Sequence, residues 1–204
     1  MPLLPYLEID RLEAGCDEVG RGCLCGPVVA AAVILPADYA NEFINDSKKL
    51  TKENREAVLE AIKSNALAWA VAEASVAEID SINILQASFL AMSRAVSALA
   101  KQPQHLLIDG NRFKSTLDIP YDCIIKGDGK FASIAAASIL AKVYRDELMC
   151  RHALLYPGYG WETNVGYPTA AHREGILKLG ITPLHRKSFR LLPEQLNIEF
   201  EGKD

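Results

Sequence analysis

The chain has 204 residues, which is enough for one well-packed domain and few for two. Half of the residues are hydrophobic and 24% are charged, a composition that excludes a disordered, collagen-like or disulfide-stapled chain. The net charge is −4, yet residues 126–190 hold ten Lys and Arg against five Asp and Glu, which leaves a polyanionic partner open.

Strand and helix patterns alternate along the chain, as is typical of an α/β protein. Apolar runs predict strands at 13–17, 24–35, 66–74, 105–108 and 121–125. Helical periodicities predict a helix capped by Thr51 between the second and third strands, and further helices at 85–99, 131–151 and 169–179. Gly26 and Pro27 interrupt the second strand, and Gly180 ends the last helix. We expect a mixed β-sheet flanked by helices, with a C-terminal helical extension.

Cysteine usage and the N-terminus indicate the compartment. The five cysteines are odd in number and form no CxxC pair at zinc spacing, so we expect free thiols in a reducing cytoplasm. The N-terminus lacks the basic and apolar regions of a signal peptide, and no apolar run approaches the roughly 20 residues that span a bilayer. We therefore expect a soluble cytoplasmic protein. We also expect a monomer.

Four carboxylates stand where strands end or a helix begins. Asp17 and Glu18 end the first strand, Asp109 ends an apolar strand, and Asp128 precedes a helix. An exposed turn, a solvated strand end and a helix N-cap are the structural alternatives. Four carboxylates cannot share a small space at neutral pH unless cations neutralise them, and oxygen ligands select Mg²⁺ or Mn²⁺. Two such ions roughly 3.5–4 Å apart suit in-line attack on a phosphodiester.

Other nucleotide or catalytic motifs are poor fits. Gly20 and Gly22 allow close approach to a ligand, but their spacing to Gly26 does not match a dinucleotide fingerprint. The segment 126–130 lacks the P-loop spacing, and we expect Asp146 to pair with a neighbouring base. The histidines offer no ligand-spaced set, and His105 is expected to be structural; the others are His152, His172 and His185.

Several longer blocks resemble bacterial ribonuclease HII and occur in family order over residues 13–190. The matching blocks are residues 15–22, 26–33, 46–51, 82–86, 107–110, 126–128, 135–143, 156–160 and 185–189. The resemblance implies a ribonuclease H-like fold and an endonuclease that hydrolyses the RNA strand of RNA/DNA hybrids. It also implies cleavage 5′ of single ribonucleotides in duplex DNA, giving 3′-hydroxyl and 5′-phosphate ends, in DNA replication and repair.

The resemblance also assigns roles to individual residues. The implied catalytic and metal-binding residues are Asp17, Glu18, Asp109 and Asp128. The implied substrate-binding residues are Gly20, Arg21 and Gly22, which sense the RNA–DNA junction, and Tyr167, which stacks on the next deoxyribose. Glycine backbone groups can reach a 2′-hydroxyl, which separates RNA from DNA. We expect one domain over 1–204, with a catalytic core at 13–155, a substrate-binding extension at 156–190 and a tail at 191–204.

The chain departs from the family pattern at two places. Cys23 and Cys25 stand where Pro and Ala are usual, so we expect altered packing behind the junction turn and sensitivity to oxidation. Asn164-Val165 and Pro168 replace His-Lys and Gly around Tyr167, which removes a lysine contact to phosphate and fixes φ at Pro168.

Two other functions remain open at this stage. A structure-specific DNA resolvase on the same fold would keep the carboxylates without the turn at 20–22. A non-enzymatic nucleic-acid-binding module would need the basic third without four acids. For the ribonuclease we expect the basic third to supply the affinity, with Lys130, Arg186 and Lys187 contacting phosphates of ribonucleotide-containing and all-DNA duplexes alike.

A short segment near the C-terminus points to a protein partner. Residues 195–200 begin with Gln-Leu and end with an aliphatic residue and Phe, as do peptides that bind the bacterial sliding clamp. The alternative is that Leu196, Ile198 and Phe200, which alternate at period two, form a terminal strand or pack on the domain, and a motif of six residues is a weak signal against it.

Overall fold

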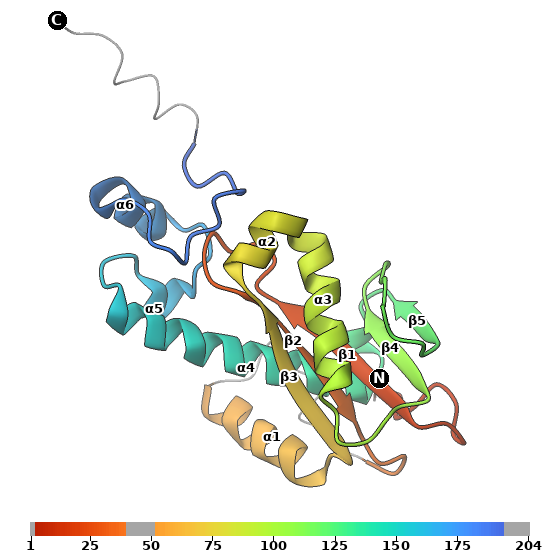
Figure 1. Cartoon of the computed structure of the whole chain (residues 1–204). Coiled ribbons are helices and arrows are strands. Elements are labelled where there is room, and N and C mark those ends of the chain that lie inside the picture. The colour runs from red at the N-terminus through yellow and green to blue at the C-terminus, as the bar shows by residue number, and fades with distance from the viewer. Residues whose placement is uncertain (1–2, 40–51, 194–204) are drawn as a thin grey trace, which may run out of the picture.

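A computed structural model describes residues 3–39 and 52–193 (Figure 1). The strands are β1 (Glu13–Val19), β2 (Val28–Ile34), β3 (Ala68–Ala74), β4 (His105–Asp109) and β5 (Tyr121–Ile124). The helices are α1 (Lys52–Asn65), α2 (Val76–Ile82), α3 (Ile84–Ser97), α4 (Ala132–Leu155), α5 (Trp161–Asn164) and α6 (Ala170–Leu179), and a 3₁₀ turn, η2 (Gly127–Gly129), precedes α4. None of the described helices is long and apolar enough to cross a membrane.

The five strands form one mixed sheet in the order β3-β2-β1-β4-β5. β2 pairs antiparallel with both β1 and β3, whereas β4 pairs parallel with both β1 and β5. The pairing of β1 with β4 places Cys16 opposite Ile108, so Asp17 and Asp109 follow at the same level. The predicted mixed sheet is therefore confirmed, and its parallel half brings two of the carboxylates to one edge.

Helices cover both faces of the sheet, α3 on one and α1 with α4 on the other (Figure 1). β2 is buried on both sides, and its side chains alternate accordingly. Val28 and Ala30 pack with the α3 layer, whereas Val29 and Ala31 pack with the α1 and α4 layer. A strand buried on both faces is apolar throughout, which explains why the segment has no polar alternation.

Small residues let α4 lie unusually close to β1. A Cβ atom at Gly15 would lie 2.2 Å from the carbonyl carbon of Ser133 and 2.3 Å from the nitrogen of Ile134. The facing turn of the helix is built from fully buried alanines, Ala135 to Ala137. This close approach is what brings the side chains of α4 to the end of β1.

The structure differs from the sequence prediction mainly at element boundaries. The second strand begins at Val28 rather than at Leu24, because Gly26 has a φ of 77° and Pro27 lacks an N–H for the ladder. Strand β3 begins at residue 68, and α4 continues four residues beyond the predicted end, to residue 155. The predicted cap at Thr51 lies outside the described residues.

Two short helices, α2 and α5, were not predicted. α2 carries a capping box in which the Ser75 hydroxyl accepts the Glu78 N–H at 3.3 Å. In return, the Ser75 N–H donates to the Glu78 carboxylate at 2.8 Å. The spacing Ser-x-x-Glu was therefore a readable start signal. α5 has only four residues and no side-chain cap, so it offers no comparable signal.

We expect Gly15→Ala to destabilise the protein by about 1–3 kcal/mol, because the added methyl group meets helix backbone that cannot rotate away. Chemical denaturation measures the change in the free energy of unfolding. Gly22→Ala is the matched control, because a Cβ atom there has nothing within 4 Å. Equal stability of the two variants would contradict the close packing of α4 against β1.

Candidate active site

Asp17 is the buried carboxylate of the site, with 7% of its surface exposed. Its side chain hydrogen-bonds to Ser138 of α4, and its Oδ1 accepts the Glu18 N–H at 2.7 Å. Burial, with smaller contributions from the charges of Glu18 and Asp109, raises the pKa of Asp17 to about 8. A carboxylate in this setting stays ionised near neutral pH only if positive charge is supplied.

Glu18 and Asp109 lie beside Asp17. Burial raises the pKa of Glu18, the Arg21 guanidinium opposes that rise, and the charge of Asp109 adds to it. Arg21 Nη1 lies 3.1 Å from a Glu18 carboxylate oxygen. Asp109 is fixed from the other side, because its Oδ1 accepts the Gly127 N–H at 2.6 Å. The charges of the three strand-end carboxylates therefore act on one another.

Asp128 lies in η2, immediately after Gly127, and is half-buried. The N-cap residue of α4 is Phe131, which makes no side-chain cap, so the helix-cap alternative for Asp128 is wrong. The hydrogen bond from Gly127 to Asp109 ties this turn to the end of β4. Asp128 is thus held in the turn that borders the other carboxylates.

The donor set fits hard divalent cations. It consists of carboxylate oxygens, the ligands that Mg²⁺ and Mn²⁺ prefer, and it carries mutual repulsion that a cation would relieve. Within residues 3–39 and 52–193, no three Asp, Glu, His or Cys side chains already have the spacing of a formed metal site. The chemistry of the donor set therefore fits such cations, and the side chains of Asp17 and Glu18 have close neighbours that orient them.

The turn after β1 is packed on one side and open on the other. Gly20 has a φ of 93°, and a Cβ atom there would lie 2.2 Å from Arg145 Nε. At Gly22 a Cβ atom would have nothing within 4 Å. Only Gly22 therefore leaves the space that a ligand would need for close approach to the backbone.

Two fully buried arginines hold this turn from behind. Arg186 donates from Nη2 to the Gly20 carbonyl at 2.7 Å and from Nη1 to the Arg21 carbonyl at 3.0 Å. Arg145 donates from Nη1 to the Val165 carbonyl at 2.8 Å. The prediction that Arg186 contacts phosphate is wrong, because its guanidinium is bound to backbone carbonyls inside the protein. The exposed Lys130 and Lys187 are still free to do so.

Tyr167 lies beside the same turn. The Leu24 N–H donates to the Gly166 carbonyl at 2.8 Å, and the Tyr167 hydroxyl hydrogen-bonds to the Cys23 side chain. The residue is 39% exposed. Cys23 and Cys25 are fully buried, and burial raises the pKa of both thiols, which opposes the expected sensitivity to oxidation.

The sequence also predicted the surroundings of His105, Asp146 and the C-terminal histidines. His105 is structural as expected, with Nε2 2.9 Å from the Asp122 carboxylate, and Asp146 pairs with Lys142 at 2.7 Å. The two C-terminal histidines, for which the sequence predicted no metal-ligand spacing, form a buried hydrogen-bonded pair: the Nε2 atoms of His172 and His185 lie 3.2 Å apart.

The sequence predicted no part in the site for Ser138 or Arg145, and it assigned Arg186 to a phosphate contact instead of to the turn. A signal for Ser138 existed, since a hydroxyl among alanines on a buried helix face needs a polar partner. Arg145 and Arg186 bind backbone carbonyls. Because every residue has a carbonyl, the sequence does not indicate which ones bind an arginine.

Three solved structures are similar to this fold. The ribonuclease H2 from Pyrococcus horikoshii OT3 gives a TM-score of 0.73 at 24% identity, covering 88% of this chain and 94% of that one. The ribonuclease HII in the PCNA:RNase HII complex from Archaeoglobus fulgidus gives 0.71 at 23% identity, covering 92% and 99%. Bst-RNase HIII in complex with Mn²⁺ gives 0.68 at 22% identity, covering 92% and 70%. The expected ribonuclease H-like fold is thereby confirmed.

Sequence comparison identifies the family. Ribonuclease HII of Parabacteroides distasonis is 61% identical over 198 residues, which cover 97% of this chain and 100% of that protein. Ribonuclease HII of Bacteroides thetaiotaomicron is 61% identical over 199 residues, covering 97% and 100%. The family model for ribonuclease HII matches residues 14–192. The chain therefore belongs to the ribonuclease HII family and is an endoribonuclease, a hydrolase.

Proposed function

We propose that the chain hydrolyses the RNA strand of RNA/DNA hybrids and cuts 5′ of single ribonucleotides in duplex DNA. The products would carry a 3′-hydroxyl and a 5′-phosphate, and the reaction would serve ribonucleotide removal in replication and repair. The observation that carries this proposal is the position of Asp17 and Asp109 at one sheet edge, next to the open turn at Gly22. The acids proposed for hydrolysis would then lie next to the backbone proposed to recognise the sugar.

The proposed cofactors are Mg²⁺ or Mn²⁺, two ions in the active complex, held by Asp17, Glu18, Asp109 and Asp128. When bound, they supply charge neutralisation at the phosphate and an activated water. The chain itself orients the carboxylates: Ser138 and backbone N–H groups fix two of them. The similar Bst-RNase HIII was solved with Mn²⁺, and it shares this fold.

Substrate recognition is proposed to divide between the turn and the loop. The backbone at Gly20, Arg21 and Gly22 would contact the 2′-hydroxyl, the group that distinguishes RNA from DNA. Tyr167 would stack on the following deoxyribose. Support comes from the open Cβ position at Gly22 and from the hydrogen bond that holds the tyrosine next to Cys23. A resolvase would not need a turn built in this way.

A cleavage assay with three labelled duplexes tests the function directly. One duplex contains a single ribonucleotide, the second is all DNA, and the third is a branched all-DNA junction. Cutting only 5′ of the ribonucleotide supports the proposal. Cutting of the branched substrate would favour the resolvase, and binding without cutting would favour a non-enzymatic module.

Asp17→Asn should abolish cleavage in saturating Mg²⁺, because it removes a charged ligand while keeping the size of the side chain. In the metal-free protein the pKa of Asp17 is about 8, above its ordinary value of 3.8, so the folded state binds the extra proton. Stability is therefore lost as pH rises from about 4 to about 8. At pH 9 without metal, we expect the variant to melt at a higher temperature than the wild type, and we expect the difference to shrink toward zero as the pH falls to about 4.

The exposed Asp118→Asn is the control, and it should change neither cleavage nor the pH dependence of melting. Near wild-type cleavage by Asp17→Asn would remove Asp17 from the site. A lower melting temperature of Asp17→Asn at pH 9 would show that the buried carboxylate is not a source of repulsion.

Gly22→Val should reduce the preference for ribonucleotide-containing duplex and leave the affinity for all-DNA duplex intact. The valine side chain would fill the open space through which the ribonucleotide would approach the backbone of the turn.

Lys130→Gln and Lys187→Gln should instead weaken the binding of both duplexes, and each should lower the salt dependence of binding by about one counterion. Equilibrium binding at several salt concentrations measures both effects. The assignment fails if Gly22→Val weakens both duplexes equally and keeps the preference.

We also propose a monomer that acts in the cytoplasm, with a catalytic core at 13–155 and a substrate-binding extension at 156–190. The buried Arg145, which belongs to α4, binds the Val165 carbonyl and so ties the extension to the core. The extension would thus deliver Tyr167 to the edge of the core.

A second proposed partner is the bacterial sliding clamp, bound through residues 195–200 of the tail 191–204. These six residues lie outside the described residues, and the similar archaeal enzyme was solved in a PCNA:RNase HII complex. Removing residues 194–204 should abolish clamp binding in a pull-down with purified clamp and leave cleavage of short duplexes unchanged. A loss of thermal stability on truncation would instead favour packing of the tail on the domain.

A further inference from the structure

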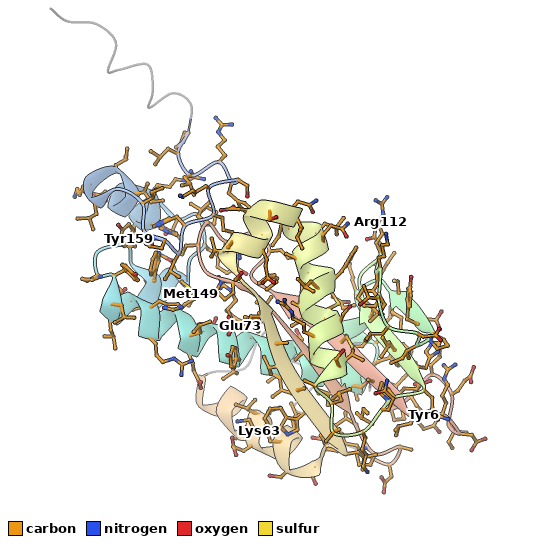
Figure 2. The ribbon with its side chains drawn as sticks, viewed as in Figure 1. Tyr6, Lys63, Glu73, Arg112, Met149 and Tyr159 are labelled. Atoms are coloured by element: carbon orange, nitrogen blue, oxygen red, sulfur yellow. The ribbon has the colours of Figure 1, made fainter. Side chains whose placement is uncertain are left out.

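The C-terminal extension contains a buried aromatic cluster at the end of α4, next to α5 and α6. Figure 2 shows Tyr159 in this part of the molecule, and its ring stacks on Trp161 at 5.0 Å between centroids. His172 and His185 complete the cluster, and both imidazoles are buried. The substrate-cleaving carboxylates play no part in it.

One chain of hydrogen bonds runs through the two imidazoles. The Trp161 indole N–H donates to His172 Nε2 at 2.9 Å, and His185 Nε2 lies 3.2 Å from the same nitrogen. His172 Nδ1 lies 3.0 Å from the Tyr167 carbonyl oxygen. At the far end, the Thr182 N–H donates to His185 Nδ1 at 2.9 Å. The chain therefore starts in the loop after α6 and ends on the backbone of Tyr167.

The fixed groups determine where each proton sits. The Thr182 N–H can only donate, so His185 Nδ1 accepts and its proton lies on Nε2. The Trp161 N–H can only donate and the Tyr167 carbonyl can only accept, so His172 carries its proton on Nδ1. A proton on His172 Nε2 would face two other donors.

Both imidazoles are held neutral by their surroundings. Burial lowers the pKa of His172, and the nearby Arg173 guanidinium lowers it further against the opposing effect of the Tyr167 carbonyl. Burial and the His172 ring lower the pKa of His185 to about 4. One arrangement of protons therefore persists across the neutral range, and the His172 bond to Tyr167 keeps its direction.

We propose that His172 is a positioning residue for Tyr167, orienting the tyrosine through its backbone carbonyl, with His185 and Trp161 fixing the tautomer that makes this possible. The inference rests on the proposed substrate role of Tyr167. That carbonyl also accepts the Thr169 N–H at 2.8 Å, so His172 adds a second hydrogen bond to the same carbonyl oxygen. The role is indirect, because His172 is buried and does not reach the substrate.

A matched pair of variants isolates this bond. Asn and Leu are nearly isosteric, and both lose the ε nitrogen, but only Asn keeps a donor near the position of Nδ1. We expect His172→Leu to have a kcat/KM on the ribonucleotide-containing duplex about fivefold below that of His172→Asn, the size of one net hydrogen bond. The same pair at His152, which lies outside the cluster, should show no such difference.

The pair is then repeated in a Tyr167→Ala background, where the two His172 variants should have equal kcat/KM. An equal gap in both backgrounds would overturn the inference, because the effect would not pass through Tyr167. If Tyr167→Ala alone leaves cleavage unchanged, the proposed role of Tyr167 fails and the inference fails with it, whereas the metal-site proposal is untouched.

A measurement on the wild-type protein does not depend on any variant folding. Nuclear magnetic resonance correlations between imidazole nitrogens and ring protons distinguish the Nδ1–H from the Nε2–H tautomer. At pH 7 we expect His172 as the Nδ1–H form and His185 as the Nε2–H form. His172 found as the Nε2–H form or as an imidazolium would overturn the proposal.

Discussion

Parallel backbone pairing between β1 and β4 is the constraint on which the site depends. The ladder ends with Cys16 opposite Ile108, so the next residue on each strand, Asp17 or Asp109, emerges at the same level. A slip of one residue in either strand would turn its carboxylate to the other face of the sheet. The helix layers packed on both faces oppose that slip, since it would move a side chain of β1 into the space where Gly15 meets the backbone of α4. The packing of the core thus protects the geometry of the acids.

The burial of Asp17 follows from how closely α4 approaches the sheet. Gly15 has no side chain where the helix backbone passes, and this lets Ser138 reach the carboxylate two residues further along β1. The same contact removes water from Asp17, which is the largest cause of its raised pKa. A wider gap would leave a solvated acid with an ordinary pKa. Packing density and the need for cations are therefore two results of one local feature.

The parts that sequence could predict are those with local signals. Strand ends followed by glycine and small polar residues located Asp17 and Asp109, and helical periodicity located α3 and α4 within a few residues. The roles of Arg145 and Arg186 could not be predicted, because their partners are backbone carbonyls brought near only by the folded chain. The ring contact between the C-terminal histidines was hidden for the same reason, since it depends on a turn after α6. The excess of basic residues in the C-terminal third predicted an exposed Arg186, whereas the folded chain buries this residue.

The two buried guanidiniums join the core and the extension into one recognition unit. Arg186, from the extension, binds carbonyls of the turn after β1, and Arg145, from the core, binds the Val165 carbonyl near Tyr167. Each side of the proposed substrate site is thus anchored by a residue from the other. A buried charge is tolerated only when its hydrogen-bonding groups are satisfied. Breaking the hydrogen bonds of either arginine would therefore leave an unpaired buried charge, at a large cost in free energy. Under the proposed function, the turn and the tyrosine would move together or not at all, and phosphate affinity would be left to exposed lysines such as Lys130. Affinity and discrimination would then rest on separate residues, one set solvated and adjustable, the other buried and rigid.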